Sequence, residues 1–154
     1  MYIKSFSENE TIKLGEKFSK FLRPKDVVIL DGWLGSGKTI FTKGILKGFG
    51  VRKLVTSPTF TLIKEYKKSN TYIYHVDLYR IDRSDFETIG LEDILYKDDS
   101  IVLIEWGKKI CNLLSEYIRV KFHFLSNNSR RIFFSLKSKQ QDRISYLKNI
   151  FCFK

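Results

Sequence analysis

One segment, GWLGSGKT at residues 32–39, restricts what this chain can fold into more than any other. Gly32 and Gly37-Lys38-Thr39 fit G-x-x-x-x-G-K-[ST], the Walker A pattern. Glycines let the backbone curl so that its N–H groups converge on phosphate oxygens, and the helix that follows presents partial positive charge to the same anion. The lysine can reach the β- and γ-phosphates, and the threonine hydroxyl can ligate Mg²⁺. The segment therefore predicts a site for nucleotide phosphates.

The residues on either side of this loop have the pattern that such a site needs. The run VVIL at 27–30 is entirely apolar and predicts a strand that is buried on both faces. Residues 40–49 predict a helix, with Gly50 as its C-terminal stop. Because the loop lies between a buried strand and a helix, a glycine-rich turn that matches by chance is a poor explanation.

The rest of the chain alternates between predicted helices and strands. Ser7 and Glu10 form a capping box at the start of a helix that Pro24 stops. Strands at 60–66 and 72–79 are close enough in sequence to form an antiparallel hairpin. The other predicted elements are a short helix opened by a capping box at 84–87 and ended by Gly90, a buried strand at 101–104, a strand pair at 117–124 and 131–136 around a turn at 126–129, and a C-terminal helix at 140–151. We therefore predict a single α/β domain over residues 1–154 with a three-layer, P-loop NTPase-like fold, in which helices cover both faces of a mixed sheet that contains antiparallel strand pairs.

Composition limits the classes of protein and partner. The 154 residues carry a formal net charge of +11, which favours encounters with nucleic acid or acidic protein faces. The charge is scattered, so a generally basic, solvated surface is the alternative. No run approaches the roughly 18 apolar residues of a membrane span, and the first residues lack the apolar core of a signal peptide. Cys111 and Cys152 have no metal-type spacing and fit two reduced thiols, so we expect a cytoplasmic protein.

Two carboxylates follow apolar strands, where the ligands of open α/β sheets gather. Asp77 ends the strand that begins at residue 72, and Glu105 follows the apolar run at 101–104. Either could hold Mg²⁺ directly or through water, and Glu105 could instead orient or deprotonate an attacking water. The alternatives are a strand-end turn residue for Asp77 and a surface carboxylate for Glu105. His75, two residues before Asp77, would share its strand face, in a supporting or a purely structural role.

The order and spacing of four blocks resemble the TsaE family (formerly YjeE), the small P-loop ATPases of bacterial tRNA threonylcarbamoyladenosine synthesis. The blocks are the Walker A loop, SPTFTL at 57–62, DLYR at 77–80 and EW at 105–106. Shorter similarities at 10–15, 41–44 and 90–93 extend the resemblance over nearly the whole chain. A Walker A loop alone would indicate only a superfamily.

The resemblance assigns expected roles to individual residues. It implies that ATP is bound by Gly32, Leu34, Gly35, Ser36, Gly37, Lys38 and Thr39, that Thr59, Trp106, Thr11 and Arg131 also belong to the nucleotide site, and that Mg²⁺ is held by Thr39, Asp77 and Glu105. Within this set, Lys38 and Glu105 would be catalytic, and Thr59 would lie in a loop that responds to the nucleotide. Thr11 and Arg131 would border the base and ribose.

The resemblance also implies partners. Family members are weak ATPases alone and act with TsaD and TsaB, which transfer the threonylcarbamoyl group to adenosine 37 of tRNAs that read ANN codons. This chain would then hydrolyse ATP to support or reset the TsaD–TsaB pair, and would not be the transferase. Direct and indirect contact with tRNA both stay open.

The chain departs from the family pattern at a few positions. Trp33 stands where the family commonly has Asp or Glu, Ser36 and Ile40 replace Ala and Thr, and Gly107 follows the EW pair where proline is common. Trp33 removes a negative charge beside a polyphosphate site. It could stack on a partner, cover the loop, or be a partly packed surface side chain.

Two other classes of function remain as alternatives. A small P-loop kinase acting on a nucleoside or another small molecule would share the strand, loop and helix, but such kinases usually add a lid that carries several arginines. No insertion of lid size is evident, although Arg80, Arg83, Arg130 and Arg131 are available. The second alternative is a binding module that uses ATP only as a structural ligand. A GTPase is disfavoured because the chain has no [NT]-K-x-D motif for guanine.

Overall fold

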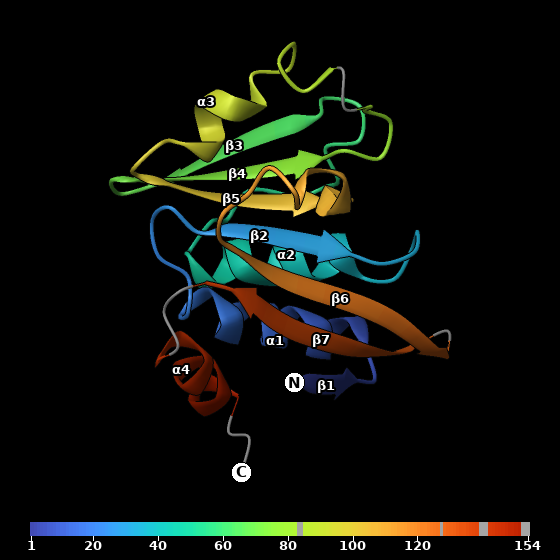
Figure 1. Cartoon of the computed structure of the whole chain (residues 1–154). Helices are drawn as coiled ribbons and strands as arrows, with labels where there is room; N and C mark the ends of the chain where they lie inside the picture. The colour runs from blue at the N-terminus through green and yellow to red at the C-terminus, as the bar shows by residue number, and fades with distance from the viewer. Residues whose placement is uncertain (83–84, 127, 139–141, 152–154) are drawn as a thin grey trace.

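A seven-stranded mixed sheet runs through the chain in the order β1-β7-β6-β2-β5-β4-β3 (Figure 1). The strands are β1 (Tyr2–Ser5), β2 (Val27–Asp31), β3 (Ile63–Lys68), β4 (Thr71–Asp77), β5 (Ser100–Glu105), β6 (Tyr117–Ser126) and β7 (Ser129–Lys137). The central pairs β6–β2, β2–β5 and β5–β4 are parallel, whereas β3–β4, β6–β7 and β1–β7 are antiparallel. The predicted mixed sheet with antiparallel strand pairs is therefore confirmed.

The computed structural model describes residues 1–82, 85–126, 128–138 and 142–151. Several predicted features fall outside these ranges. They are Arg83 among the arginines considered for a lid, Ser84 of the second capping box, Asn127 of the β6–β7 turn, Gln140 at the start of the C-terminal helix, and Cys152. Cys111 is a free thiol.

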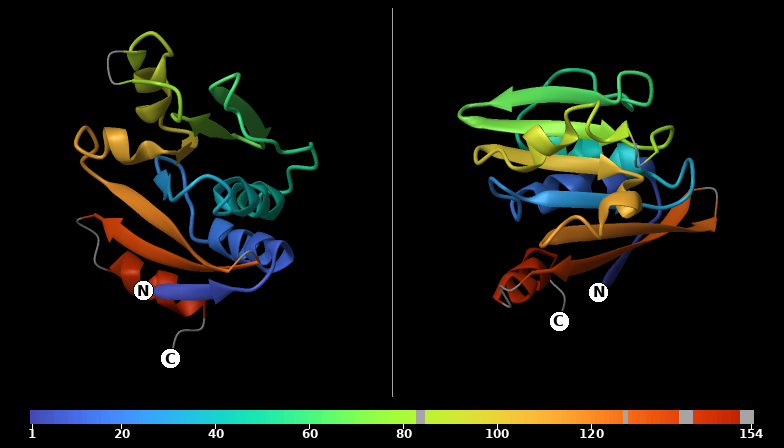
Figure 2. Two further views of the ribbon diagram at one scale, coloured as in Figure 1. Left: turned by 90° about the vertical axis from the view of Figure 1, so that its right-hand side faces the viewer. Right: turned by 45° about the horizontal axis from the view of Figure 1, so that its top comes forward.

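Helices cover both faces of the sheet, as predicted (Figures 1 and 2). On one face α1 (Glu8–Ser19), α2 (Lys38–Gly48) and α4 (Asp142–Ile150) enclose a core that contains Phe18, Phe41 and Leu147. On the other face α3 (Leu91–Leu95) and the 3-10 helix η2 (Gly107–Ile110) pack over β2, β5 and β4. In the described parts of the chain, no helix is both long and apolar enough to cross a lipid bilayer.

Strand β2 lies between the two cores and positions the phosphate loop. Val28 and Leu30 belong to the core beneath α1 and α2, and Val27 and Ile29 belong to the core beneath α3 and η2. This explains why residues 27–30 are all apolar rather than alternating. The chain leaves β2 at Asp31, forms the loop at 32–37, and enters α2 at Lys38.

Most predicted boundaries agree with the structure within a few residues. The Ser7 side chain accepts a hydrogen bond from the Glu10 amide, and the Glu10 carboxylate accepts one from the Phe6 amide, one residue before the expected partner. The residue Gly50 follows α2 with φ 78°, as a C-terminal stop requires.

Two predictions need correction, and one strand was missed. Strand β3 begins at Ile63 rather than at residue 60, because residues 59–62 form turns and Leu62 has φ 63°. Gly90 precedes α3 as its N-cap, with φ 67°, and does not end a helix. The edge strand β1 was not predicted, since four residues with a single apolar position facing the core carry little pattern.

Helices α1 and α2 approach so closely at Gly15 and Gly44 that neither position has room for a side chain. An added Cβ at Gly44 would lie 2.1 Å from the carbonyl oxygen of Ile12, and one at Gly15 would lie 2.3 Å from that of Phe41. Both obstacles are backbone atoms, which cannot rotate away. This contact fixes α2, and with it the phosphate loop, against the N-terminal helix.

We therefore expect Gly44→Ala to lower the free energy of unfolding by about 1–3 kcal/mol, because the methyl group would force the two helices apart. In an unobstructed helix the same change would raise the free energy of unfolding by up to about 1 kcal/mol. The sign of the change therefore shows whether the two helices are in close contact. Urea denaturation would measure the change, with Lys13→Ala at an exposed position of α1 as the control. A Gly44→Ala protein more stable than the wild type would contradict the close helix contact.

Candidate nucleotide-binding site

The loop between β2 and α2 turns sharply through its glycines. Gly32, Gly35 and Gly37 have φ values of 149°, 74° and 105°, in the region that side chains disfavour. A Cβ on Gly32 would also lie 2.8 Å from the carbonyl oxygen of Phe122 on β6. This curled backbone at the N-terminus of an eleven-residue helix has the arrangement that suits a bound phosphate.

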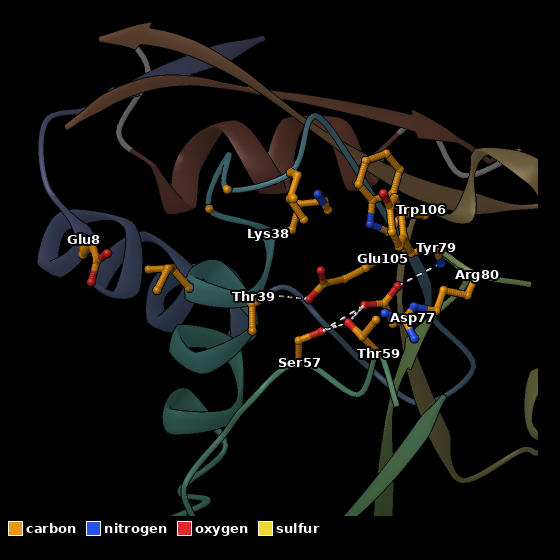
Figure 3. A pocket seen from close by; sticks show the side chains of 14 residues that line it. Glu8, Lys38, Thr39, Ser57, Thr59, Asp77, Tyr79, Arg80, Glu105 and Trp106 are labelled. Atoms are coloured by element: carbon orange, nitrogen blue, oxygen red, sulfur yellow. Dashed lines mark hydrogen bonds between the residues drawn. The ribbon is translucent and has the colours of Figure 1, made fainter. Parts of the chain in front are cut away.

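Lys38, the first residue of α2, points back across this loop (Figure 3). Its ammonium donates hydrogen bonds to the carbonyl oxygens of Gly32 (2.9 Å) and Trp33 (3.0 Å) and lies 4.2 Å from the centroid of the Trp106 ring. Burial lowers the pKa of Lys38, and the nearby carboxylates of Glu105 and Asp77 partly oppose that shift. The ammonium is thus a desolvated cation held by neutral groups, ready to contact an anion.

Glu105 lies at the end of β5, between α2 and β4. Its Oε1 atom accepts a hydrogen bond from the Thr39 hydroxyl (2.8 Å) and lies 2.9 Å from Nε2 of the buried His75. Its other oxygen points into the pocket (Figure 3). His75 therefore supports Glu105 directly, rather than Asp77, whose strand face it shares.

Asp77 lies beside Glu105, because these two residues are Cα partners in the parallel β4–β5 pair. Its Oδ2 atom accepts hydrogen bonds from the hydroxyls of Ser57 (2.9 Å) and Thr59 (2.6 Å), and its Oδ1 atom accepts one from the Tyr79 amide (2.9 Å). The segment at 56–62 is therefore tied to the sheet through the carboxylate of Asp77.

These groups surround one cavity of about 490 Å³, a size within the range of small-molecule sites. Of the residues predicted from the sequence, the structure brings together around it Leu34, Gly35, Gly37, Lys38, Thr39, Thr59, Asp77, Glu105 and Trp106. Gly32 and the buried Ser36 shape the loop without lining the cavity.

The donor groups in this cavity fit a magnesium–nucleotide complex. Thr39, Asp77 and Glu105 supply a hydroxyl and two carboxylates, and Mg²⁺ is usually held by one or two carboxylates together with substrate phosphates. Within the described ranges, no group of three or more His, Cys, Asp and Glu side chains could hold a metal without other ligands.

Two predicted residues, Thr11 and Arg131, lie away from the cavity. Thr11 is buried, and its hydroxyl accepts a hydrogen bond from Arg130 (2.8 Å). Since side chains alternate along β7, Arg131 lies on the opposite sheet face from Arg130, with its guanidinium 4.8 Å from the Tyr2 ring centroid. Arg130, which was not assigned to the site, is the arginine that packs beside Gly37.

Other residues at the cavity were missed. Glu8, Ile40, Ser57, Tyr79 and Arg80 also line it. Three of them, Ser57, Tyr79 and Arg80, belong to the SPTFTL and DLYR blocks, which gave a usable signal for them. No sequence pattern indicated Glu8, because α1 approaches the loop only through its packing against α2.

Trp33 is 78% exposed, so it lies on the surface and only a small part of its side chain packs against the rest of the protein. It lines a second cavity of about 340 Å³ together with Trp106, on the side of the loop that faces β6.

The buried Lys38 ammonium predicts that the wild type and a variant without this charge differ in stability by an amount that depends on pH. Because the pKa of Lys38 is lower in the folded protein than in the unfolded chain, the protonated side chain costs stability at neutral pH, and this cost disappears as the pH rises through the folded pKa toward 10.5. We expect Lys38→Met to raise the Tm at pH 7 by about 2–4 °C, and the gap to the wild type to shrink by pH 10. Thermal denaturation at both pH values measures the gap, with the exposed Lys17→Met as the control. A gap independent of pH would contradict a desolvated lysine.

Comparison with known proteins agrees with this arrangement. Residues 5–132 match the family described as Threonylcarbamoyl adenosine biosynthesis protein TsaE. The tRNA threonylcarbamoyladenosine biosynthesis protein TsaE of Rickettsia conorii is 42% identical, over 80% of this chain and 71% of that protein. The Bacillus subtilis protein of the same name is 35% identical, over 86% of this chain and 83% of that protein. The crystal structure of Bacillus subtilis YdiB superposes with a TM-score of 0.79 and 27% identity, covering 99% of this chain and 94% of that one.

The YdiB match extends over the whole sheet, so the P-loop NTPase-like fold expected from the loop is confirmed. The family match contains the Walker A loop, the SPTFTL and DLYR blocks and Glu105-Trp106, which together form the cavity. The chain therefore belongs to the TsaE family of tRNA threonylcarbamoyladenosine biosynthesis proteins.

Proposed function

We propose that this chain binds Mg²⁺ and ATP in the cavity at the phosphate loop, hydrolyses the ATP, and thereby supports or resets a TsaD–TsaB pair in the cytoplasm. The observation that carries the proposal is the convergence of Lys38, Thr39, Asp77 and Glu105 from α2, β4 and β5 on one cavity. Packing alone would not require these four polar or charged side chains to converge.

The loop and α2 would bind the phosphates. Lys38 would exchange its two carbonyl partners for phosphate oxygens, a stronger charge-assisted contact. Mg²⁺, when bound, would neutralise phosphate charge, with Thr39 and Asp77 as protein ligands and Glu105 as a ligand directly or through water. Trp106 would close the side of the site, since its ring already packs against Lys38 and Tyr79.

Glu105 would orient the attacking water and accept its proton. Its Oε1 atom is fixed by Thr39 and His75, which leaves the second oxygen free to face the cavity. Catalysis of phosphoryl transfer is mostly positioning and electrostatic stabilisation, so a carboxylate with one oxygen held by Thr39 and His75 suits this role. His75 would be a positioning residue.

The hydrogen bonds at Asp77 would couple the nucleotide to the surface. A metal ion bound at Asp77 would compete with the hydroxyls of Ser57 and Thr59 for the same carboxylate. The segment at 56–62 would then change its contacts according to whether the γ-phosphate and metal are present, as switch segments do. Phe60, 85% exposed in this segment, is placed to carry such a change to a partner.

The positions of the arginines support the kinase alternative less well than ATP hydrolysis. Of the three described candidates for a lid, only Arg80 lines the cavity. Arg130 is buried and bonded to Thr11, and Arg131 lies on the other sheet face. Hydrolysis therefore explains the site better than transfer to a small acceptor.

The proposal predicts slow release of ADP and phosphate by the protein alone and faster release with purified TsaD and TsaB. Glu105→Gln should lower the hydrolysis rate by about 100-fold while retaining ATP binding, because the amide keeps the size of the side chain and an oxygen that can face Mg²⁺ but cannot accept a proton from water. Lys38→Ala should weaken ATP binding itself. Phosphate release and a fluorescent nucleotide titration measure the two effects, with Glu92→Gln on exposed α3 as the control.

Turnover that strictly required a small-molecule acceptor would support the kinase alternative instead. If Glu105→Gln abolished hydrolysis but left tRNA modification by the full system at the wild-type rate over many rounds, ATP would be a structural ligand and the proposed cycle would be wrong.

A further inference from the structure

The face of the sheet formed by β1, β6 and β7 is open on one side. Side chains at even positions of β6 and β7, such as Phe122 and Phe134, belong to the core beneath α1, α2 and α4. Side chains at odd positions point the other way. On that side the described helices α3 and η2 pack over β2, β4 and β5, and leave β6 and β7 uncovered (Figures 1 and 2).

Two rows of side chains cross this open face. The strand registers pair Tyr2 with Phe133 and Phe133 with Lys121, and in the next row Lys4 with Arg131 and Arg131 with His123. Within the first row, the Tyr2 and Phe133 rings have centroids 5.4 Å apart, and between the rows the His123 and Phe133 rings have centroids 5.1 Å apart. Tyr2 is 47% exposed, and His123 is also exposed. The face thus presents aromatic rings to solvent, interleaved with cations.

The charge of this face has one sign. Strands β1, β6 and β7 contain no aspartate or glutamate, while Lys4, Arg119, Lys121, Arg131 and Lys137 all occupy positions on the open side. Arg119 is paired with Asp31 of β2. Within the described ranges, Lys4, Lys121 and Arg131 form no ion pair with a carboxylate. The Arg131 guanidinium lies over the Tyr2 ring, 4.8 Å from its centroid, so this cation and this ring form one unit of the face.

We propose that this basic, aromatic sheet face binds single-stranded RNA. Exposed rings on a sheet stack unpaired bases, and surrounding lysines and arginines contact the phosphates, which is the general chemistry of single-strand recognition. An acidic protein would satisfy the cations but would leave the rings without planar partners. The choice of RNA as the polyanion rests on membership of a tRNA-modifying family; the binding itself needs neither ATP nor TsaD and TsaB.

The RNA face is continuous with the phosphate loop. Lys121 and His123 also line the second cavity, whose other side is formed by Trp33 and Trp106. Trp33, largely exposed on the loop itself, adds a further ring at this end of the face. RNA that extended from β6 into this cavity would contact Trp106, whose ring also touches Lys38.

The test is the fluorescence anisotropy of a labelled oligouridine of about 12 nucleotides, titrated with the full chain without nucleotide. The affinity should fall as the salt concentration rises. The slope of the logarithm of the association constant against the logarithm of the salt concentration should be about −3 if four phosphates are contacted. A triple variant (Lys4→Gln, Lys121→Gln, Arg131→Gln) should bind at least about tenfold more weakly, with a slope near −1. The control with the same net charge is Lys13→Gln, Lys17→Gln, Lys53→Gln, which should bind like the wild type.

Stacking is tested separately. Tyr2→Ala should weaken binding at least about fivefold, whereas Tyr146→Ala, a similarly exposed tyrosine on α4, should not. In the wild-type protein, 4-thiouridine crosslinks should map to β1, β6 and β7, which tests the site even if a variant unfolds. Three results would overturn the inference: equal loss in the triple variant and its charge control, duplex RNA bound as tightly as the single strand, or polyglutamate bound more tightly than RNA. ATP turnover is assayed apart from these, so its absence would count only against the proposed ATPase.

Discussion

The hydrogen bond from Thr39 to Glu105 is the contact on which the rest of the site depends. It joins the first turn of α2 to the end of β5, and thereby fixes the phosphate loop relative to the carboxylates. The contact exists because β2 and β5 are parallel neighbours, with Leu30 and Glu105 as Cα partners. In a parallel sheet the carboxyl ends meet at one edge, so residues 66 positions apart in sequence become a single site.

The site also carries a cost that packing elsewhere must offset. Lys38, Asp77 and Glu105 are at least 95% buried, and burying charged groups is unfavourable unless each finds partners. Here the partners are two loop carbonyls, three hydroxyls, a histidine and a backbone amide. The wide cores on both sheet faces and the close contact of α1 with α2 hold this polar cluster in place. Protein groups thus contact the same atoms of Lys38, Asp77 and Glu105 that we propose a magnesium–nucleotide complex would contact.

The sequence predicted the elements whose patterns are local and strong. Three of these patterns each follow from one local physical requirement: the apolar run of β2, the glycine loop and the capping box at Ser7. The structure has all three. Relations between distant segments were harder to predict. Nothing local distinguishes Arg130 from Arg131: only the register of β7 decides which one faces Thr11 and which one faces Tyr2. His75 likewise acquires its partner, Glu105, from the β4–β5 pairing. The exposed face of β1, β6 and β7 depends on where the helices stop, and β1 itself gave no signal.

The central claim is that Asp77 belongs to a metal site completed by ATP. It is tested most directly by calorimetric titration with a non-hydrolysable ATP analogue, in Mg²⁺ and in EDTA, for the wild type and for Asp77→Asn. The account predicts that Mg²⁺ strengthens binding to the wild type and that Asp77→Asn loses most of this gain, while affinities in EDTA stay similar. Equal wild-type affinity in Mg²⁺ and in EDTA would contradict the account.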